Sequence, residues 1–250
     1  MLSGLVTATR TLTLLTVPGK DTENFSRSLY WFPVVGLLLG LMQAAFGYVG
    51  HLFAWNELAA ALVVLGGMAL TRGMHADGLA DMADGFWGGK TREAALRIMK
   101  DPNVGSFGAL ALSALLLLKW IAILKLLEKG AFSVLVSGVL LARWVQVLLA
   151  SYMPYARSEG GTAQAFVSGA GASHIVVAST LTLFFLVPFF YLDLISFVVV
   201  ISAAVVAGVM IAQLSYRKIG GVTGDVLGAG SEMTEVLVWI AGAISISLSR

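Results

Sequence analysis

Apolar stretches of bilayer length recur along this chain and limit the folds that it can adopt. The first, from Trp31 to Gly50, holds no charged residue, and an α-helix needs about 20 mostly apolar residues to cross a membrane. Four further stretches cover 107–127, 131–152, 175–191 and 195–214, and two shorter ones cover 58–70 and 236–248. The chain is therefore predicted to be an all-α, polytopic membrane helix bundle with about seven transmembrane helices.

The overall composition agrees with a membrane protein and excludes other classes. Only 12% of the residues are charged, against about 25% in soluble domains. The formal net charge of +2 gives no reason to expect nucleic-acid binding, and the absence of cysteine excludes disulfides and thiol chemistry. Residues 1–250 are treated as a single integral membrane domain. Residues 1–17, which mix apolar residues with threonines, predict an amphipathic helix rather than a secretory signal.

The distribution of cations predicts which loops face the cytoplasm. With the N-terminus inside, most lysines and arginines fall in cytoplasmic segments, as the positive-inside rule requires. The inner cations are Arg10, Lys20, Arg27, Arg72, Lys90, Arg92, Arg97, Lys100, Arg157, Arg217 and Lys218, and the outer ones are Lys125, Lys129 and Arg250. Lys119 lies inside an apolar stretch and is expected to snorkel to the interface. The three longest polar segments, 72–108, 154–174 and 215–235, then share the cytoplasmic side, which is typical of an enzyme with cytoplasmic active-site loops.

The first polar segment carries the strongest chemical signal. Asp77, Asp81 and Asp84 recur at i, i+4 and i+7, a spacing that puts all three on one face of a helix. Three carboxylates on one face repel each other, and a divalent cation with oxygen ligands is the simplest reason for the pattern. A solvated loop whose acids are paired by neighbouring arginines is the alternative. We favour the metal because these acids lie beside a membrane.

Cations and a histidine surround these acids. His75 is either a hydrogen-bonded loop residue or a general base or phosphate ligand. Arg92, Arg97 and Lys100 lie on or just after a short amphipathic helix, where they bind lipid headgroups or substrate phosphates. Lys100 ranks above the two arginines because it immediately precedes a turn. Arg143 stands inside an apolar stretch, so we expect it to point inward and pair with a carboxylate or phosphate rather than snorkel.

The third polar segment is rich in glycine and leads into a run of acids. Gly221, Thr223 and Gly224 precede Asp225, and a glycine-rich stretch that enters a helix can cradle phosphate with its backbone N–H groups. Asp225, Glu232 and Glu235 again have the spacing of one helical face. The alternative is a helix N-terminus, where acidic side chains favourably meet the helix dipole.

Three ordered blocks of these residues resemble the cobalamin-5′-phosphate synthase family, also called adenosylcobinamide-GDP ribazoletransferase. The blocks are His75 to Asp81 with Asp84-Gly85 and Gly88-Gly89, Ile98 to Asp101 with Gly105 to Gly108, and Gly221 to Ala229 with Glu232 and Glu235. Trp31-Phe32-Pro33 and Gly36 are similar to the family's first-span signature. Pro102 and the stretch from Leu15 to Pro18 depart from the family's usual residues, and neither departure touches the acids.

The resemblance implies the assembly of the lower nucleotide loop of vitamin B12. A ribose hydroxyl of α-ribazole, or of its 5′-phosphate, attacks a phosphorus of adenosylcobinamide-GDP, GMP leaves, and adenosylcobalamin or its 5′-phosphate forms. Mg²⁺ is the implied cofactor. The implied location is the cytoplasmic membrane of a bacterium or archaeon, with the active site facing the cytosol and the lipid bilayer as a further partner. The oligomeric state stays open, a homo-oligomer being one alternative.

Roles for individual residues follow as hypotheses. Asp77, Asp81, Asp84 and Asp225 hold one or two Mg²⁺ ions. The catalytic set is His75, Asp81, Lys100 and Arg143, in which Lys100 and Arg143 bind phosphate oxygens and His75 or an aspartate takes the hydroxyl proton. The substrate-binding set is Arg72, Gly221, Thr223, Gly224, Glu232 and Glu235.

Two other functions compete with this interpretation. A CDP-alcohol phosphotransferase also uses membrane-embedded aspartates, but its signature begins Asp-x-x-Asp-Gly, and here Asp77-Gly78 is followed by Leu79-Ala80-Asp81. A transporter would line a path with intramembrane charges, whereas most charges here lie in loops on one side. The sequence leaves open whether the ribazole is phosphorylated and which lower base it carries.

Overall fold

The computed structural model describes residues 2–248, and this part of the chain is helical with no strand. Its elements are α1 (Leu2–Leu12), the 3-10 helix η1 (Phe25–Trp31), α2 (Phe32–Leu52), α3 (Asn56–Leu70), α4 (Met74–Gly88), α5 (Arg92–Ile98), α6 (Ser106–Glu128), α7 (Phe132–Tyr152), α8 (Gln164–Val167), α9 (Ala172–Phe190), α10 (Leu194–Ile219) and α11 (Gly224–Leu248). In this range 6 helices are long and apolar enough to cross a membrane, or 7 if α3 and α4 form one bent span. The protein is a multi-pass membrane protein, as predicted. Arg250, counted above as an outer cation, lies outside the described residues.

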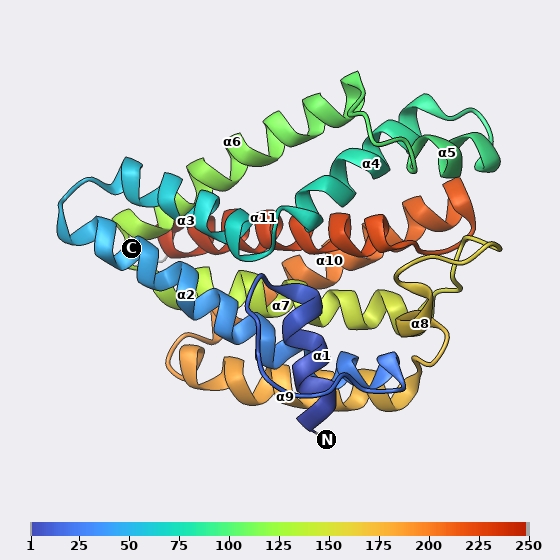
Figure 1. Ribbon diagram of the computed structural model, residues 1–250. Helices are drawn as coiled ribbons and strands as arrows, with labels where there is room; N and C mark the ends of the chain where they lie inside the picture. The colour runs from blue at the N-terminus through green and yellow to red at the C-terminus, as the bar shows by residue number, and fades with distance from the viewer. Residues whose placement is uncertain (1, 249–250) are drawn as a thin grey trace.

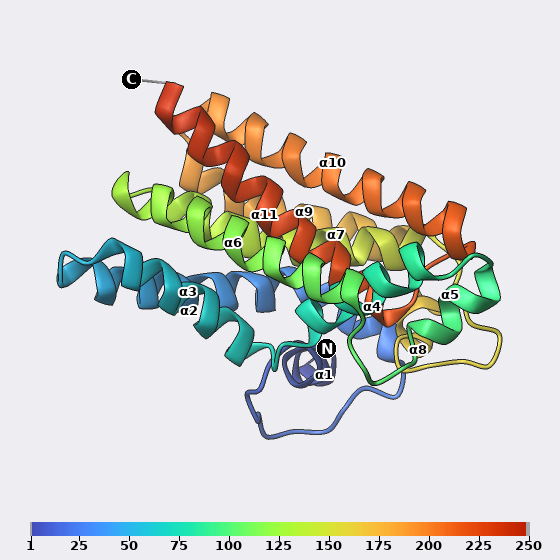
Figure 2. The same ribbon diagram turned by 90° about the horizontal axis from the view of Figure 1, so that it is seen from above.

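The polar connections gather at one end of the bundle. In Figure 1 the α4–α5 region, α8 and the α10–α11 turn lie at the right, whereas the α2–α3 and α6–α7 turns and the end of α11 lie at the left. Figure 2 shows the same separation from above. The α4–α5 region, the segment 154–174 and the start of the segment 215–235 thus share one end of the bundle, whereas the rest of 215–235 runs into the bundle as part of α11.

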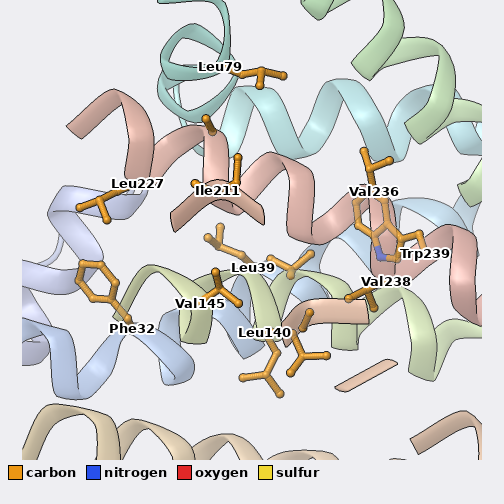
Figure 3. Packing of buried hydrophobic residues seen from close by; sticks show 14 of the residues in the cluster. Phe32, Leu39, Leu79, Leu140, Val145, Ile211, Leu227, Val236, Val238 and Trp239 are labelled. Atoms are coloured by element: carbon orange, nitrogen blue, oxygen red, sulfur yellow. The ribbon is translucent and has the colours of Figure 1, made fainter. Parts of the chain in front are cut away.

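Helix α7 forms the centre of the bundle, and small residues let its neighbours approach it closely. It packs against α2, α9, α10 and α11, and Figure 3 shows its Leu140 and Val145 among side chains of the surrounding helices. A Cβ atom on Gly40 of α2 would lie 2.8 Å from the carbonyl oxygen of Val136. Close backbone contact through small residues is the usual basis of helix association in membranes, where the hydrophobic effect between helices is lost.

Helix α11 is longer than the sequence indicated. It runs without a break from Gly224, whereas residues up to 235 were expected to form a polar segment before a short span over 236–248. Glu232 and Glu235 therefore lie inside the bundle. Acidic residues can occupy such a position only when cations compensate them.

Those compensating cations come from α6 and α7. Lys119 Nζ lies 2.5 Å from Glu232 Oε2 and 2.6 Å from Glu235 Oε2, and the Lys119 side chain is only 8% exposed. The expectation that Lys119 snorkels is therefore wrong, because two buried carboxylates offer it a stronger partner than the interface. Arg143 Nη1 lies 3.4 Å from Glu235 Oε1 and also donates to Ser231 Oγ. The predicted inward pairing of Arg143 with a carboxylate is confirmed, and we call Lys119, Arg143, Glu232 and Glu235 the ion cluster.

A sharp corner joins α3 to α4. Their axes differ by 86°, and the turn places Arg72 (φ 55°) and Gly73 (φ 68°) consecutively in the left-handed region. A left-handed conformation is costly for arginine, and tertiary contacts hold it here. Arg72 Nη2 donates to the carbonyl oxygens of Arg10 (2.9 Å) and Thr13 (3.1 Å). The corner therefore fixes the end of α1 and directs α4 across the start of α11.

The crossing of α4 over α11 depends on two glycines. A Cβ atom on Gly78 would lie 2.8 Å from the backbone oxygen of Asp225, and one on Gly228 would lie 3.2 Å from the Cα atom of His75. With hydrogen in place of a methyl group, the two backbones come close enough to set the acids of α4 beside Asp225.

Replacing Gly78 by alanine is expected to lower the thermal stability of the protein. The added methyl group would meet α11 backbone that cannot move aside, and overpacking of this kind costs about 1–3 kcal/mol, more than the roughly 1 kcal/mol that alanine gains over glycine in a helix. The control is Gly88→Ala in the same helix, where the nearest heavy atom is Ile98 Cδ1 at 3.5 Å. Thermal unfolding in detergent should separate the two variants, and equal midpoints would contradict the close crossing.

Lys119→Met is expected to destabilise the protein strongly, because two buried carboxylates lose their shared cation. Breaking a buried ion pair from one side costs about 3–5 kcal/mol. The double variant Lys119→Met with Glu232→Gln should recover part of the loss, because one of the uncompensated charges is also removed. Thermal unfolding monitored by size-exclusion chromatography measures both effects, and a double variant less stable than Lys119→Met would speak against the ion cluster.

Candidate active site

An open acidic face forms where α4 crosses α11. Asp77 is exposed and Asp81 half-buried on α4, and Asp225 is half-buried in the first turn of α11. The negative charges of Asp77, Asp84 and Asp225 all act on Asp81, and Asp77 acts on Asp225. The structure thus brings together the four carboxylates that the sequence singled out. We call Asp77, Asp81 and Asp225, which reach solvent, the acidic face.

Asp84 differs from the other three because backbone amides surround its carboxylate. Its Oδ2 accepts from Gly105 N (2.7 Å) and its Oδ1 from Gly108 N (2.9 Å). These amides open α6, so the buried carboxylate caps that helix at its positive end. The two glycines are required because a Cβ atom at either position would collide with the carboxylate. Asp84 therefore fixes α6 against α4.

Arg157 is a site residue that the sequence reasoning missed. Its Nη2 donates to Asp225 Oδ2 (3.0 Å) and its Nη1 to the Leu96 carbonyl oxygen (3.3 Å). Thr223 Oγ1 also donates to Asp225 Oδ2 (3.2 Å), and the amide of Val226 donates to that hydroxyl at the start of α11. In the sequence, Arg157 is expected only to be a cytoplasmic cation, and no motif marks it. Its place in a polar segment on the same side was the only available signal.

A backbone strap ties the second polar segment to the third. Tyr155 and Val222 form an isolated parallel β-bridge, with Val222 N donating to Pro154 O (2.9 Å). Gly221 lies so close to the Pro154 carbonyl that a Cβ atom could not fit. Arg92 donates from Nε to Ile219 O (2.7 Å) and from Nη2 to the Ala156 carbonyl oxygen (2.7 Å). Gly221 and Arg92 thus hold the loops beside Asp225.

A basic cavity of about 530 Å³, with more cations than acids in its lining, is joined to the acidic face through Arg157, which contacts Asp225. Its lining is Arg92, Glu93, Leu96, Arg97, Lys100, Ala156, Arg157, Ser158 and Glu159. Lys100 pairs with Glu159 across it, with side chains 48% and 66% exposed. The hydrogen bond and charge of Lys100 lower the pKa of the Glu159 carboxyl. This basic cavity has the charge and access to bind a phosphorylated ligand.

A second cavity, of about 230 Å³ and mostly apolar, adjoins the acidic face on another side. Its lining is Thr11, Leu12, Leu29, Phe32, Met74, His75, Gln146, Thr162, Ala163, Phe166, Gly224, Leu227 and Gly228. His75 is only 3% exposed and lies in the first turn of α4, not in a loop. Asp225 contacts Arg157 of the basic cavity and directly follows Gly224 of this apolar cavity, so the start of α11 borders both.

Not all predicted site residues reach the acidic face. Arg143, Glu232 and Glu235 are committed to the ion cluster within the bundle, further along α11, and Arg72 is committed to α1 at the α3–α4 corner. Thr223 and Gly224 do lie beside Asp225, in the cap of α11 and in the wall of the apolar cavity, and Lys100 lines the basic cavity that also contains Arg157.

The donor chemistry of the acidic face fits Mg²⁺ better than a metal with an all-protein cage. Within residues 2–248, no group of three or more histidine, aspartate or glutamate side chains forms a ready-made metal site. Mg²⁺ usually keeps several waters and binds to one or two carboxylates together with substrate phosphates. An open face of hard oxygen ligands beside a basic cavity meets that requirement.

Comparison with known proteins identifies the family. The model of the cobalamin-5-phosphate synthase family matches residues 4–243. Proteins named adenosylcobinamide-GDP ribazoletransferase include one from Pelodictyon phaeoclathratiforme, 72% identical over 99% of both chains, and one from Chlorobium chlorochromatii, 66% identical over 99% of this chain and 98% of the relative. One from Syntrophobacter fumaroxidans is 38% identical over 95% and 91%. No solved structure matches this chain. The chain therefore belongs to the cobalamin-5-phosphate synthase family.

Proposed function

We propose that this protein transfers α-ribazole, or its 5′-phosphate, onto adenosylcobinamide-GDP with release of GMP, in a reaction that depends on Mg²⁺. The observation that carries the proposal is the acidic face, which adjoins a basic cavity in a chain of this family. A phosphoryl-transfer site needs both features, one to hold a metal ion and one to bind phosphates. Family membership does not favour the CDP-alcohol phosphotransferase or the transporter.

The guanosine diphosphate end of adenosylcobinamide-GDP, the electrophilic substrate, binds in the basic cavity. Arg97, Lys100 and Arg157 supply cations there, and Lys100 is held only by an exposed pair with Glu159. Exposed ion pairs contribute little to stability, so a phosphate can replace Glu159 as the partner of Lys100 at small cost. Arg157 remains beside Asp225 and links the bound phosphates to the acidic face.

Asp77, Asp81 and Asp225 are the residues that would hold Mg²⁺. When bound, the ion supplies neutralisation of the diphosphate charge and activation of the attacking hydroxyl. Asp84, the fourth residue of the predicted set, is assigned instead to positioning, because both of its oxygens accept from the amides that open α6.

The transfer breaks a phosphoanhydride bond and forms a phosphoester bond. The ribose hydroxyl attacks the phosphorus that carries cobinamide, and the bond from this phosphorus to the bridging oxygen breaks, so that GMP leaves with that oxygen. We assign the hydroxyl proton to Asp81, because burial and the nearby negative charges of Asp77 and Asp225 raise its pKa to about 7. His75 is the other predicted acceptor, but its side chain lies within the apolar cavity. Arg97 and Lys100 stabilise the charge on the departing GMP.

The protein lies in the cytoplasmic membrane of the cell, and the end of the bundle that carries the site faces the cytosol. The excess of arginine and lysine in the segments at this end supports that orientation.

Asp81→Asn is expected to reduce the rate of GMP release at least about 100-fold, because the face loses both a metal ligand and the proton acceptor. The assay uses purified protein with adenosylcobinamide-GDP and α-ribazole phosphate, with and without Mg²⁺. Asp193→Asn is the control, since it lies at the opposite end of the bundle, where asparagine can also cap α10. Normal transfer with normal Mg²⁺ dependence in Asp81→Asn would refute the assignment, and release of CMP from a CDP-alcohol would favour the alternative enzyme.

The double variant Arg97→Gln with Lys100→Gln is expected to raise the KM for adenosylcobinamide-GDP about 10- to 100-fold, the range for lost charge-assisted hydrogen bonds. The KM for α-ribazole should stay within about twofold, because its site lies elsewhere. Lys90→Gln is the matched control, an exposed cation of the same segment outside the basic cavity. Steady-state kinetics at two ionic strengths measure the effect, and an equal rise in both KM values would contradict the assignment of the cavity.

A further inference from the structure

We propose that a groove between α6 and α10, of about 580 Å³, binds one anionic phospholipid from the leaflet on the side of the acidic face. The phosphate lies at Arg217, and one acyl chain follows the groove toward the middle of the bilayer. This lipid site is separate from the acidic face and from the basic cavity, and it does not depend on the reaction proposed for them.

Four helices form the groove. Helix α11 packs against both α6 and α10, and Figure 2 shows it between them. Val236 and Leu237 of α11 lie at the bottom of the groove, and Ala114 of α6 and Met210 of α10 lie in its two walls. Leu79 of α4 lies at the end that is nearest to the active-site loops. The groove is therefore a furrow along the bundle, closed on one side by α4.

The groove opens toward the bilayer, which determines what fills its apolar part. Leu117 and Leu118 of α6 and Val206 and Met210 of α10 are 43% to 57% exposed. Both helices are long and apolar enough to cross a membrane. Apolar side chains exposed on such helices meet lipid tails, which are as apolar as leucine. The hydrocarbon that lies next to the groove is an acyl chain.

The polarity of the groove changes along α10 in the order of a phospholipid. Arg217 and Gln213, both exposed, line the groove one helical turn apart on the same face. In the described part of the chain Arg217 has no hydrogen bond or ion pair, whereas the neighbouring Lys218 donates to the Phe86 carbonyl oxygen. Trp87, which is 56% exposed, lines the same end, as tryptophan does at the level of lipid headgroups. A free guanidinium for phosphate and an amide for an ester carbonyl thus precede the apolar part.

The length of the groove agrees with one leaflet. Ala207 lines the groove ten positions before Arg217, which corresponds to about 15 Å along a helix. The hydrocarbon core of a bilayer is about 30 Å thick, so that one leaflet contributes about 15 Å. An acyl chain whose headgroup is held by Arg217 therefore reaches the middle of the bilayer within the groove.

The bound chain packs behind the helix that carries the acids. Leu79 and Ala83 line the groove, and each follows an acid of the face, Asp77 or Asp81, by two residues, so the two sets point away from each other. A lipid that binds only the folded protein stabilises it by mass action. Its expected effect is to hold α4 in place from the side that faces the membrane.

Native mass spectrometry of the full-length protein tests the site without requiring turnover. The protein is given equal amounts of phosphatidylglycerol and phosphatidylcholine with the same acyl chains. The wild type should retain phosphatidylglycerol about fivefold over phosphatidylcholine, the preference that one arginine contributes toward an anionic lipid. Arg217→Gln should bring the ratio close to one. Lys90→Gln is the matched control, because it removes an exposed cation at the same end that does not line the groove, so it should keep the preference.

A second variant fills the groove. Ala114 is exposed in the wall, and the ring of Ala114→Phe would occupy the path of the chain, so retention of both lipids should fall at least about fivefold. Ala109→Phe adds the same ring to the same helix at an exposed position outside the groove and should retain lipid normally. In detergent, added phosphatidylglycerol should raise the thermal midpoint of the wild type but not that of Ala114→Phe.

Equal retention of the two lipids by the wild type would overturn the inference, and so would an unchanged preference in Arg217→Gln. Normal lipid retention in Ala114→Phe would place the lipid elsewhere. A lipid-free dimer that Ala114→Phe dissociates would instead assign the groove to a second copy of the chain. The two variants test different parts of the site, so that the failure of one to fold leaves the other decisive.

Discussion

The close crossing of α4 over α11 is the contact on which the rest of the site depends. Gly78 and Gly228 allow the two backbones to approach, and only this approach sets Asp77 and Asp81 beside Asp225 from the far end of the chain. The left-handed corner at Arg72 and Gly73 supplies the direction of α4. Asp84 then fixes α6 against α4, because its carboxylate accepts hydrogen bonds from the amides of Gly105 and Gly108 at the start of α6.

Helix α11 carries acidic residues in two different environments, buried and paired within the bundle or open to solvent at its end. Glu232 and Glu235 lie inside the bundle, where each carboxylate has Lys119 or Arg143 as a partner, because an unpaired charge there would be very costly. Asp225 lies at the mouth of the bundle, where solvent tolerates mutual repulsion with the acids of α4. The ion cluster therefore joins helices, while the acidic face keeps the negative charge that can attract a metal ion.

The sequence predicted what depends on local pattern and missed what depends on distant contacts. Apolar length gave the spans, and the i, i+4, i+7 spacing placed Asp77, Asp81 and Asp84 on one helix. It could not show that Asp84 caps a helix more than twenty residues away, or that Arg157 reaches Asp225. The last span was predicted to begin at residue 236, after the true start of α11, because Glu232 and Glu235 are acidic residues typical of a polar loop. The lysine that compensates them, Lys119, is remote in sequence.

The order of the cavities around the acidic face bears on the direction of the proposed reaction. In phosphoryl transfer the attacking and leaving oxygens lie roughly in line on opposite sides of phosphorus. Asp225 contacts Arg157 of the basic cavity and adjoins Gly224 of the apolar one. The first turn of α11 therefore contacts the lining of both cavities, and a phosphate bound beside Arg157 would lie near Asp225. The two cavities differ in polarity, because apolar side chains line most of one and arginine and lysine side chains line much of the other, so they suit ligands of different chemistry.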